Sequence, residues 1–71
     1  MSDERTEQKT DHYLLRFFSY GHLPENLQNV SRPFATLAKS LDASLPDNSE
    51  KTVALRKLLE SKDSAVRAAL V

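Results

Sequence analysis

Apolar residues recur at steps of three and four through the middle of the chain. They are Leu27, Val30, Phe34, Leu37, Ala38, Leu41 and Leu45. This spacing marks one face of an amphipathic helix of about 22 residues. The helix is expected to begin at Leu23-Pro24-Glu25, because proline fits a first helical turn and Glu25 suits its positive end. Pro33 lies inside the stripe and Ser31 offers a fresh N-cap, so we expect a kink rather than a split there.

A second helix is predicted from Ser49, its expected N-cap, to about Leu70, after a turn at residues 45–49 that contains Pro46. One face of this helix is built of small residues and suits close approach of another helix: Ala54, Leu58, Ser61, Ala65 and Ala68. Further apolar residues spread beyond that face: Val53, Leu55, Leu59, Val66, Ala69 and Leu70. The first helix can cover one stripe only. The remaining apolar surface therefore predicts packing against other copies of the chain, and the small-residue face is the one expected to pack closely between copies.

Residues 12–20 contain four of the five aromatic residues of the protein. Periodicity cannot decide between a short helix, capped by Thr10 or Asp11, and an extended arm. Residues 1–11 are polar and are expected to form a disordered tail. The predicted fold is therefore all-α: an antiparallel helical hairpin with a short aromatic N-terminal arm, a single domain over residues 12–71, assembled as a homo-oligomer.

Composition supports the same expectation. A chain of 71 residues without cysteine has neither disulfides nor a thiolate metal site, so oligomerisation is the expected stabiliser. No apolar run is long enough to span a membrane and no signal peptide is recognisable, so a cytosolic protein is expected. Zero net charge argues against binding DNA or RNA polymers. Residues 49–71 contain five basic and three acidic side chains, so nucleic-acid binding through the second helix remains an alternative.

The sequence lacks the motifs of an enzyme, a metal site or a cofactor site. Glu60 and Asp63 share a helix face, but the flanking Arg56 and Arg67 complete a stripe of alternating charge and favour ion pairs there. The start of the second helix is the better candidate for chemistry, because free N–H groups and the helix dipole attract anions. Its candidate ligand-binding residues are Ser49, Thr52, Arg56 and Lys57, although Ser49 alone is equally well explained as an N-cap.

An aromatic ring in the arm of one copy would complete such a site at the helix terminus of another copy. A nucleotide needs that combination, since the ring stacks on the base and the cations bind the phosphate. Tyr20, beside the break at Gly21, is the candidate ring. Core or interface packing is the preferred interpretation of Phe17 and Phe18.

Four parts of the chain form one combined pattern. They are Phe18-Ser19-Tyr20, Leu23-Pro24, Phe34 with Leu37-Ala38, and the run Ser49-Glu50-Lys51-Thr52-Val53-Ala54-Leu55 with Lys57-Leu58, Glu60 and Ala65. This pattern resembles the phage anti-CBASS hairpin domain, a family related to a Thoeris anti-defence protein. The resemblance covers roughly residues 18–68. It implies a helical hairpin that assembles as a homohexamer and acts as a viral sponge. Such sponges sequester cyclic di- or trinucleotide immune messengers between protomers, here in the cytoplasm of the host bacterium.

Carried over, the resemblance implies that Tyr20 stacks on a base and that Thr52 or Lys57 reaches phosphate. Arg67 has no counterpart in it, but one arginine per copy around a threefold axis would meet the phosphates of a cyclic trinucleotide. The chain departs from the family in the polar run Ser61-Lys62-Asp63-Ser64 and at Arg56, where a small hydroxyl residue is usual. The alternative function is a small helical protein–protein interaction or regulatory module of phage origin.

Overall fold

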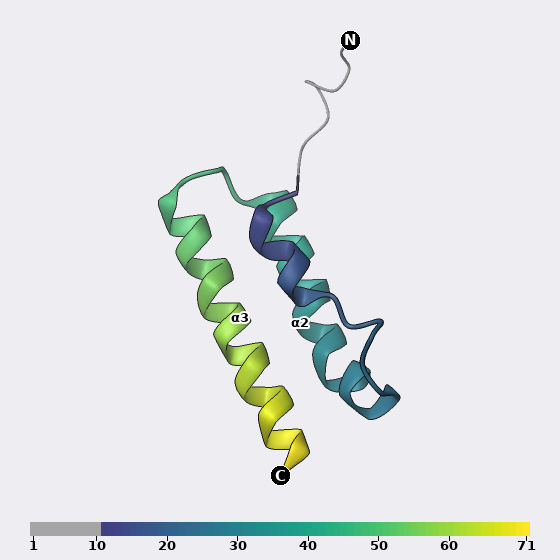
Figure 1. Cartoon of the computed structure of the whole chain (residues 1–71). Coiled ribbons are helices and arrows are strands. Elements are labelled where there is room, and N and C mark those ends of the chain that lie inside the picture. Colours follow the sequence, from purple (N-terminus) through teal and green to yellow (C-terminus); the bar gives the residue numbers. More distant parts are fainter. Residues whose placement is uncertain (1–10) are drawn as a thin grey trace.

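The computed structural model describes residues 11–71, which form two long antiparallel helices with a short helix beside them (Figure 1). The short helix η1 is a 3-10 helix over Tyr13–Phe18, and the long ones are α2, Glu25–Ser44, and α3, Ser49–Leu70. Each of the three contacts the other two, and residues 11–71 contain no strand. The predicted all-helical hairpin is therefore confirmed. The predicted tail, apart from Asp11, lies outside the described residues.

The first long helix, α2, begins after Pro24 as predicted and runs as one element through Pro33. Pro33 lies on the exposed side, where water can bond the Asn29 carbonyl that loses its helical donor. The structure corrects the role expected for Ser31. Its side chain is fully buried inside α2 rather than capping a new segment, and its hydroxyl has no hydrogen-bond partner within residues 11–71.

The second long helix, α3, is capped by Asn48, which corrects the prediction of Ser49. Asn48 has an extended backbone, and its side-chain oxygen accepts a hydrogen bond from the Lys51 N–H at 2.9 Å. Ser49 already has a helical conformation as the first residue of α3. A cap must stand just outside the helix to reach the N–H groups of its first turn, so the oxygen one residue earlier takes this role.

The core lies where the three helices meet. η1 contributes Leu14 and Phe18, α2 contributes Ala35 and Ala38, and α3 contributes Leu55. The two alanines let the other helices approach α2 closely. Because η1 supplies two large core side chains, each stabilising the fold by about 1.5–3 kcal/mol, it is an integral part of the fold.

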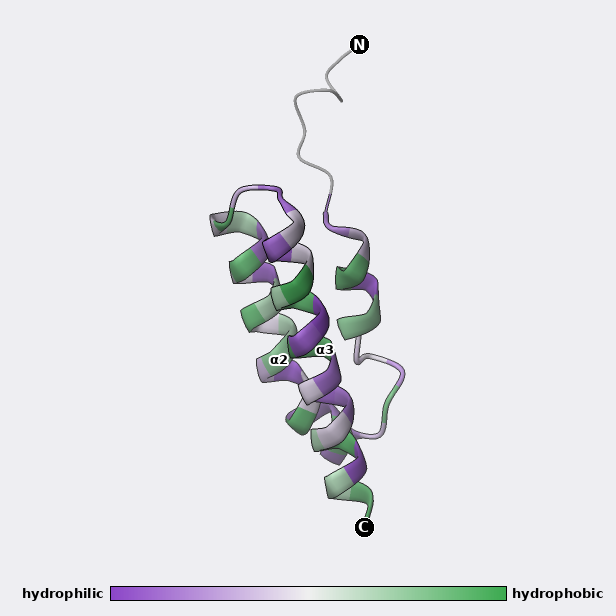
Figure 2. Ribbon diagram, turned by 90° about the vertical axis from the view of Figure 1, so that its left-hand side faces the viewer, coloured by the Kyte–Doolittle hydropathy of each residue, from purple (hydrophilic) through white to green (hydrophobic). Residues whose placement is uncertain are grey.

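The face of α3 that packs on the rest of the chain differs from the one predicted. Leu55, placed with the surplus apolar surface, is fully buried. Leu58, placed on the face for other copies, packs against the core of its own chain. Towards the end of α3, Ala68 and Ala69 are exposed and Leu70 is 66% exposed, so the helix ends in an apolar tip (Figure 2).

The segment that the sequence left undecided is a short helix rather than an extended arm. Its N-cap is His12, not Asp11, because His12 Nδ1 accepts a hydrogen bond from the Leu14 N–H at 3.1 Å. η1 ends at Phe18, and the next residue, Ser19, has an extended backbone. The connection to α2 is tied back by Gln28, whose side-chain amide donates to the Leu23 carbonyl at 2.8 Å.

Candidate functional site

The six side chains predicted to bind ligand occupy three separate places in one chain. Tyr20 follows η1, four of them lie in the first half of α3 (Ser49, Thr52, Arg56 and Lys57), and Arg67 lies in its last turn. Thr52 and Arg67 are about 22 Å apart along the helix at 1.5 Å per residue. One phosphate group therefore cannot contact both of them within a single chain.

Lys51, in the first turn of α3, has its ammonium group engaged inside the chain. Nζ lies 2.8 Å from Asp42 Oδ1 and 2.7 Å from Asp47 Oδ1, and it donates to the Asp42 carbonyl at 2.9 Å. Hydrogen bonds to Asp42 and then Asp47 raise the pKa of Lys51, although its burial opposes the shift. Lys51 thus stays charged, but its charge serves the fold and is not available to a ligand.

Thr52 is also engaged, since its Oγ1 lies 3.0 Å from Nε2 of His12. Ser49, Arg56 and Lys57 are exposed. The surroundings of this helix start are acidic, because Asp42, Asp47 and the first-turn Glu50 stand against the single ammonium of Lys51. Within a single chain, these carboxylates oppose the attraction for an anion that the N–H groups and dipole at the start of α3 were expected to provide.

The expected ion pairs of the charge stripe on α3 do not form among the described residues. Asp63 instead contacts the neighbouring Lys62, with Nζ and Oδ1 3.2 Å apart. Arg67 donates from Nη2 to Ser64 Oγ at 3.1 Å and makes no ion pair within residues 11–71. The guanidinium of Arg67 therefore keeps most of its donors for a ligand.

Arg67 lies in a cleft of about 400 Å³ between η1, the loop that follows it, and the second half of α3. Its walls are Arg16, Phe17, Ser19, His22 and Leu23 on one side and Lys62, Asp63, Val66 and Arg67 on the other. Phe17 is about half exposed, and the Arg16 guanidinium lies over its ring at 5.3 Å. The cleft thus combines an accessible aromatic ring with basic side chains.

The charges of this cleft are unbalanced, unlike those of the chain as a whole. Arg16, Lys62 and Arg67 carry permanent positive charge, and His22 adds a further hydrogen-bonding ring. Asp63 is the only carboxylate in the wall, and it is paired with Lys62. Arginine forms bidentate hydrogen bonds with phosphate, and an aromatic ring stacks on a nucleobase. The chemistry of the cleft therefore suits a small anion that carries a flat ring.

Tyr20 lies on the other side of η1 from this cleft. It packs against the core and lines a smaller cavity of about 120 Å³ with Leu15, Phe18, Ala35 and Lys39. The Arg32 guanidinium lies over its ring at 5.4 Å. Part of the ring surface expected to stack on a base is therefore already in contact with α2 of the same chain.

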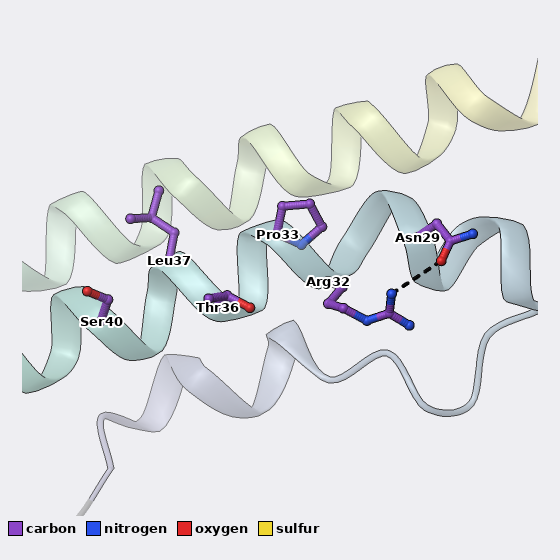
Figure 3. Close-up of a pocket in the computed structure, with 6 residues that line it drawn as sticks. All are labelled: Asn29, Arg32, Pro33, Thr36, Leu37 and Ser40. Carbon is purple, nitrogen blue, oxygen red and sulfur yellow. Dashed lines mark hydrogen bonds between the residues drawn. The ribbon is translucent and has the colours of Figure 1, made fainter.

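A larger hollow, of about 570 Å³, runs along the outer face of α2 and is lined by Asn29, Arg32, Pro33, Thr36, Leu37 and Ser40 (Figure 3). All six residues belong to one helix, so the hollow is a surface groove. Arg32 is its single charged residue, and its guanidinium bonds Asn29 Oδ1 at 3.3 Å and stacks on Tyr20. This groove lacks the converging polar groups that define a small-molecule site.

No three histidine, aspartate or glutamate residues within residues 11–71 gather into a possible metal site. Neither α2 nor α3 is apolar enough to cross a bilayer. Comparisons with protein-family models, curated proteins and solved structures found no match to this chain.

Of the cleft residues, the sequence singled out Arg67 for ligand binding but missed Arg16, His22 and Lys62. Arg16 lies in the segment defined by its aromatic residues, His22 follows the break at Gly21, and Lys62 lies in a run treated as a departure from the family. Their convergence depends on η1 folding back onto the second half of α3, and no local pattern encodes that contact. The position of Arg16 among the aromatic residues of this segment was the one feature of the sequence that indicated a binding role.

Proposed function

We propose that this protein is a non-enzymatic binder of a small anionic nucleotide, and specifically a sponge that sequesters cyclic di- or trinucleotide immune messengers of bacteria. In this proposal the protein is of phage origin, acts in the host cytoplasm as an anti-defence protein, and counters CBASS immunity. It uses no cofactor.

The cleft between η1 and α3 is the observation that carries the proposal. Arg67, Arg16 and Lys62 offer charge-assisted hydrogen bonds to phosphate oxygens. The half-exposed ring of Phe17 offers a stacking surface, and base–aromatic stacking contributes about 1–3 kcal/mol per base. The similarity of residues 18–68 to the anti-CBASS hairpin domain supplies the cyclic nature of the ligand.

We also propose that the chain works as a homo-oligomer, a homohexamer by analogy with that family. The exposed apolar end of α3 supports this, because exposed apolar surface gains stability when copies cover it. Assembly would also bring the separate groups of predicted residues together. Tyr20 of one copy and the exposed Ser49, Arg56 and Lys57 of another would then border a shared site.

Calorimetric titration with a panel of cyclic di- and trinucleotides tests the ligand, with the matching linear dinucleotides as controls. We expect saturable heat with at least one cyclic nucleotide and little with its linear counterpart. The panel includes nicotinamide-derived cyclic ADP-riboses, because the family resemblance extends to Thoeris. Absence of heat with every cyclic compound would refute the proposal.

A matched pair of variants locates the ligand. Arg67→Gln removes a cleft charge, and Arg56→Gln makes the same change about 16 Å away on the same face of α3. Loss of a hydrogen bond to a charged group costs about 1.5–3 kcal/mol, so Arg67→Gln should weaken binding about tenfold to a hundredfold. The reverse ranking would assign the ligand to the start of α3. Tyr20→Ala tests the stacking role implied by the resemblance.

A test of assembly needs a variant that disturbs the contact between copies but leaves the fold of the single chain intact. Leu58→Asp is unsuitable alone, since Leu58 packs against the chain's own core. Ala68→Glu places a charge on the predicted self-association face at an exposed position, and Ala43→Glu is a matched change near the end of α2. We expect the first to dissociate the oligomer in size-exclusion chromatography with light scattering, and the second to leave it intact.

The exposed Leu37 in the groove of α2 favours a second candidate, a helical protein–protein interaction module. The two candidates differ in what they require. A protein that remains monomeric and gives no heat with any cyclic nucleotide would fit the interaction module, whereas a ligand-binding oligomer would exclude it as the main function.

A further inference from the structure

A polar cluster near the start of η1 joins all three helices of the chain. The His12 backbone N–H donates to Asp42 Oδ2 at 3.3 Å, and its ring Nε2 lies 3.0 Å from Thr52 Oγ1. The other carboxylate oxygen of Asp42 contacts Lys51 Nζ at 2.8 Å. His12 therefore ties η1 to both α2 and α3 through one backbone and one side-chain hydrogen bond.

The hydrogen bonds also fix the direction of the His12–Thr52 contact. Nδ1 accepts from the Leu14 N–H at 3.1 Å, so the ring proton belongs on Nε2. Nε2–H then donates to Thr52 Oγ1. One imidazole thus caps η1 with one nitrogen and joins it to α3 with the other. A hydroxyl at position 52 is required as the acceptor.

We propose that Thr52 is a positioning residue that acts through His12 to fix η1 on the hairpin, and so sets the η1 wall of the cleft. Arg16 and Phe17 follow His12 by four and five residues along η1, about 8–10 Å at the rise of a 3-10 helix. Such a short rigid helix carries the orientation of its first residue to these two side chains. The effect on ligand binding rests on the proposed function, but the positioning of η1 does not.

The buried side chains of η1 limit how far loss of the Thr52–His12 hydrogen bond can disturb the helix. Leu14 and Phe18, the second and last residues of η1, are held in the core independently of the His12 side chain. Loss of the Thr52 bond should therefore loosen the first turn of η1 without detaching the helix. This assignment differs from a direct contact between Thr52 and a ligand phosphate, which would leave η1 of the free protein unchanged.

Amide hydrogen exchange in the ligand-free protein measures the positioning. Thr52→Val removes the hydroxyl but keeps the shape of the side chain, and Thr52→Ser restores the acceptor. Thr36→Val, on the exposed outer face of α2, is the matched control. We expect the Leu14 and Leu15 amides to exchange about threefold to tenfold faster in Thr52→Val, the range for one hydrogen bond. Exchange at Ala38 and Leu55 should not change, and Thr52→Ser should return to the wild-type rates.

A second variant separates the tie from the cap. His12→Asn keeps a good capping side chain but is too short to replace the ring at Thr52. It should also speed exchange at Leu14 and Leu15, and the double variant with Thr52→Val should add little, because both changes remove the same bond. Additive effects, or unchanged exchange in Thr52→Val, would overturn the proposal.

Ligand affinity then separates this inference from the proposed function. In the calorimetric panel, Thr52→Val should weaken binding of the responsive cyclic nucleotide, and Thr52→Ser should restore it. Weakened binding with unchanged exchange would make Thr52 a direct ligand contact and refute the positioning role. If no compound binds the wild-type protein, the proposed function fails, while the exchange data alone decide the positioning of η1.

Discussion

Replacing Asp42 by asparagine tests the polar cluster that joins the helices. Asp42 is 5% exposed, and its carboxylate pairs with Lys51, of which 2% is exposed. Asparagine has nearly the same shape, so the substitution removes the negative charge without opening a cavity. The Lys51 ammonium would then remain buried beside a neutral amide.

Removing one partner from a buried ion pair costs about 3–5 kcal/mol. We expect about 3 kcal/mol, because Asp47 still contacts the ammonium at 2.7 Å. The single asparagine oxygen can accept from Lys51 Nζ or from the His12 N–H, but not from both. At roughly 0.05–0.15 kcal/mol per residue, a chain of 71 residues has a total stability of about 4–11 kcal/mol. The substitution would therefore remove between a quarter and most of it.

Urea denaturation followed by circular dichroism measures the loss. With a slope of about 1 kcal/mol/M, the midpoint should fall by about 3 M. Asp63→Asn is the matched control. In its pair with Lys62 the Lys62 side chain is 13% exposed, but the Asp63 carboxylate is 48% exposed to water, so the pair should contribute at most about 1 kcal/mol. Equal effects of the two substitutions would show that the Asp42 pair does not depend on burial, and would refute this reasoning.

Three further predictions concern stability. The pKa of Lys51 is raised in the folded state, so its contribution to the free energy of unfolding should be complete below its unfolded-state pKa. This contribution should be lost as the pH rises through the higher folded-state pKa, and urea denaturation at increasing alkaline pH should show falling stability. Asn48→Ala should lower the free energy of unfolding by about 1 kcal/mol and Ser49→Ala by less than about 0.5 kcal/mol; the opposite order would restore Ser49 as the cap. Ser31→Ala should raise it by about 1 kcal/mol, because a buried hydroxyl without a partner is removed; a loss would reveal a hydrogen bond to that hydroxyl.

The long helices were predictable because their information is local. The three-and-four spacing of apolar residues gave α2, and Pro24 marked its start to within one residue, since it is the N-cap and not part of the first turn. Pro46 and the polar residues after it gave the turn into α3. Caps were harder, because Asn48 and Ser49 are both good capping residues and only the backbone conformation decides between them.

The packing of η1 was not predictable from any pattern in the sequence. Its six residues are too few to show a period, and its cap is a histidine, which is an unusual capping residue. The way η1 lies on the hairpin decides which side of α3 is buried. Without it, Leu55 was assigned to the surplus surface, and Arg16 and His22 were not recognised as neighbours of Arg67.

Lys51 and Arg67 show why the candidate ligand site in the structure differs from the one predicted from the sequence. Lys51 lies at the helix start that was expected to attract an anion, but contacts with Asp42 and Asp47 occupy its ammonium group. Arg67 looked like a partner for Asp63, but Asp63 contacts Lys62 instead. Helical spacing shows which charges can meet, and only the folded chain decides which of them do.

Native mass spectrometry of the purified protein with cyclic trinucleotide and cyclic dinucleotide reports assembly and ligand binding in one spectrum. We expect one dominant oligomer, a hexamer of the 8.0 kDa chain, that retains bound cyclic nucleotide in a fixed ratio and loses it in Arg67→Gln. A spectrum of monomers without bound nucleotide, at concentrations where the protein is folded, would contradict the proposal.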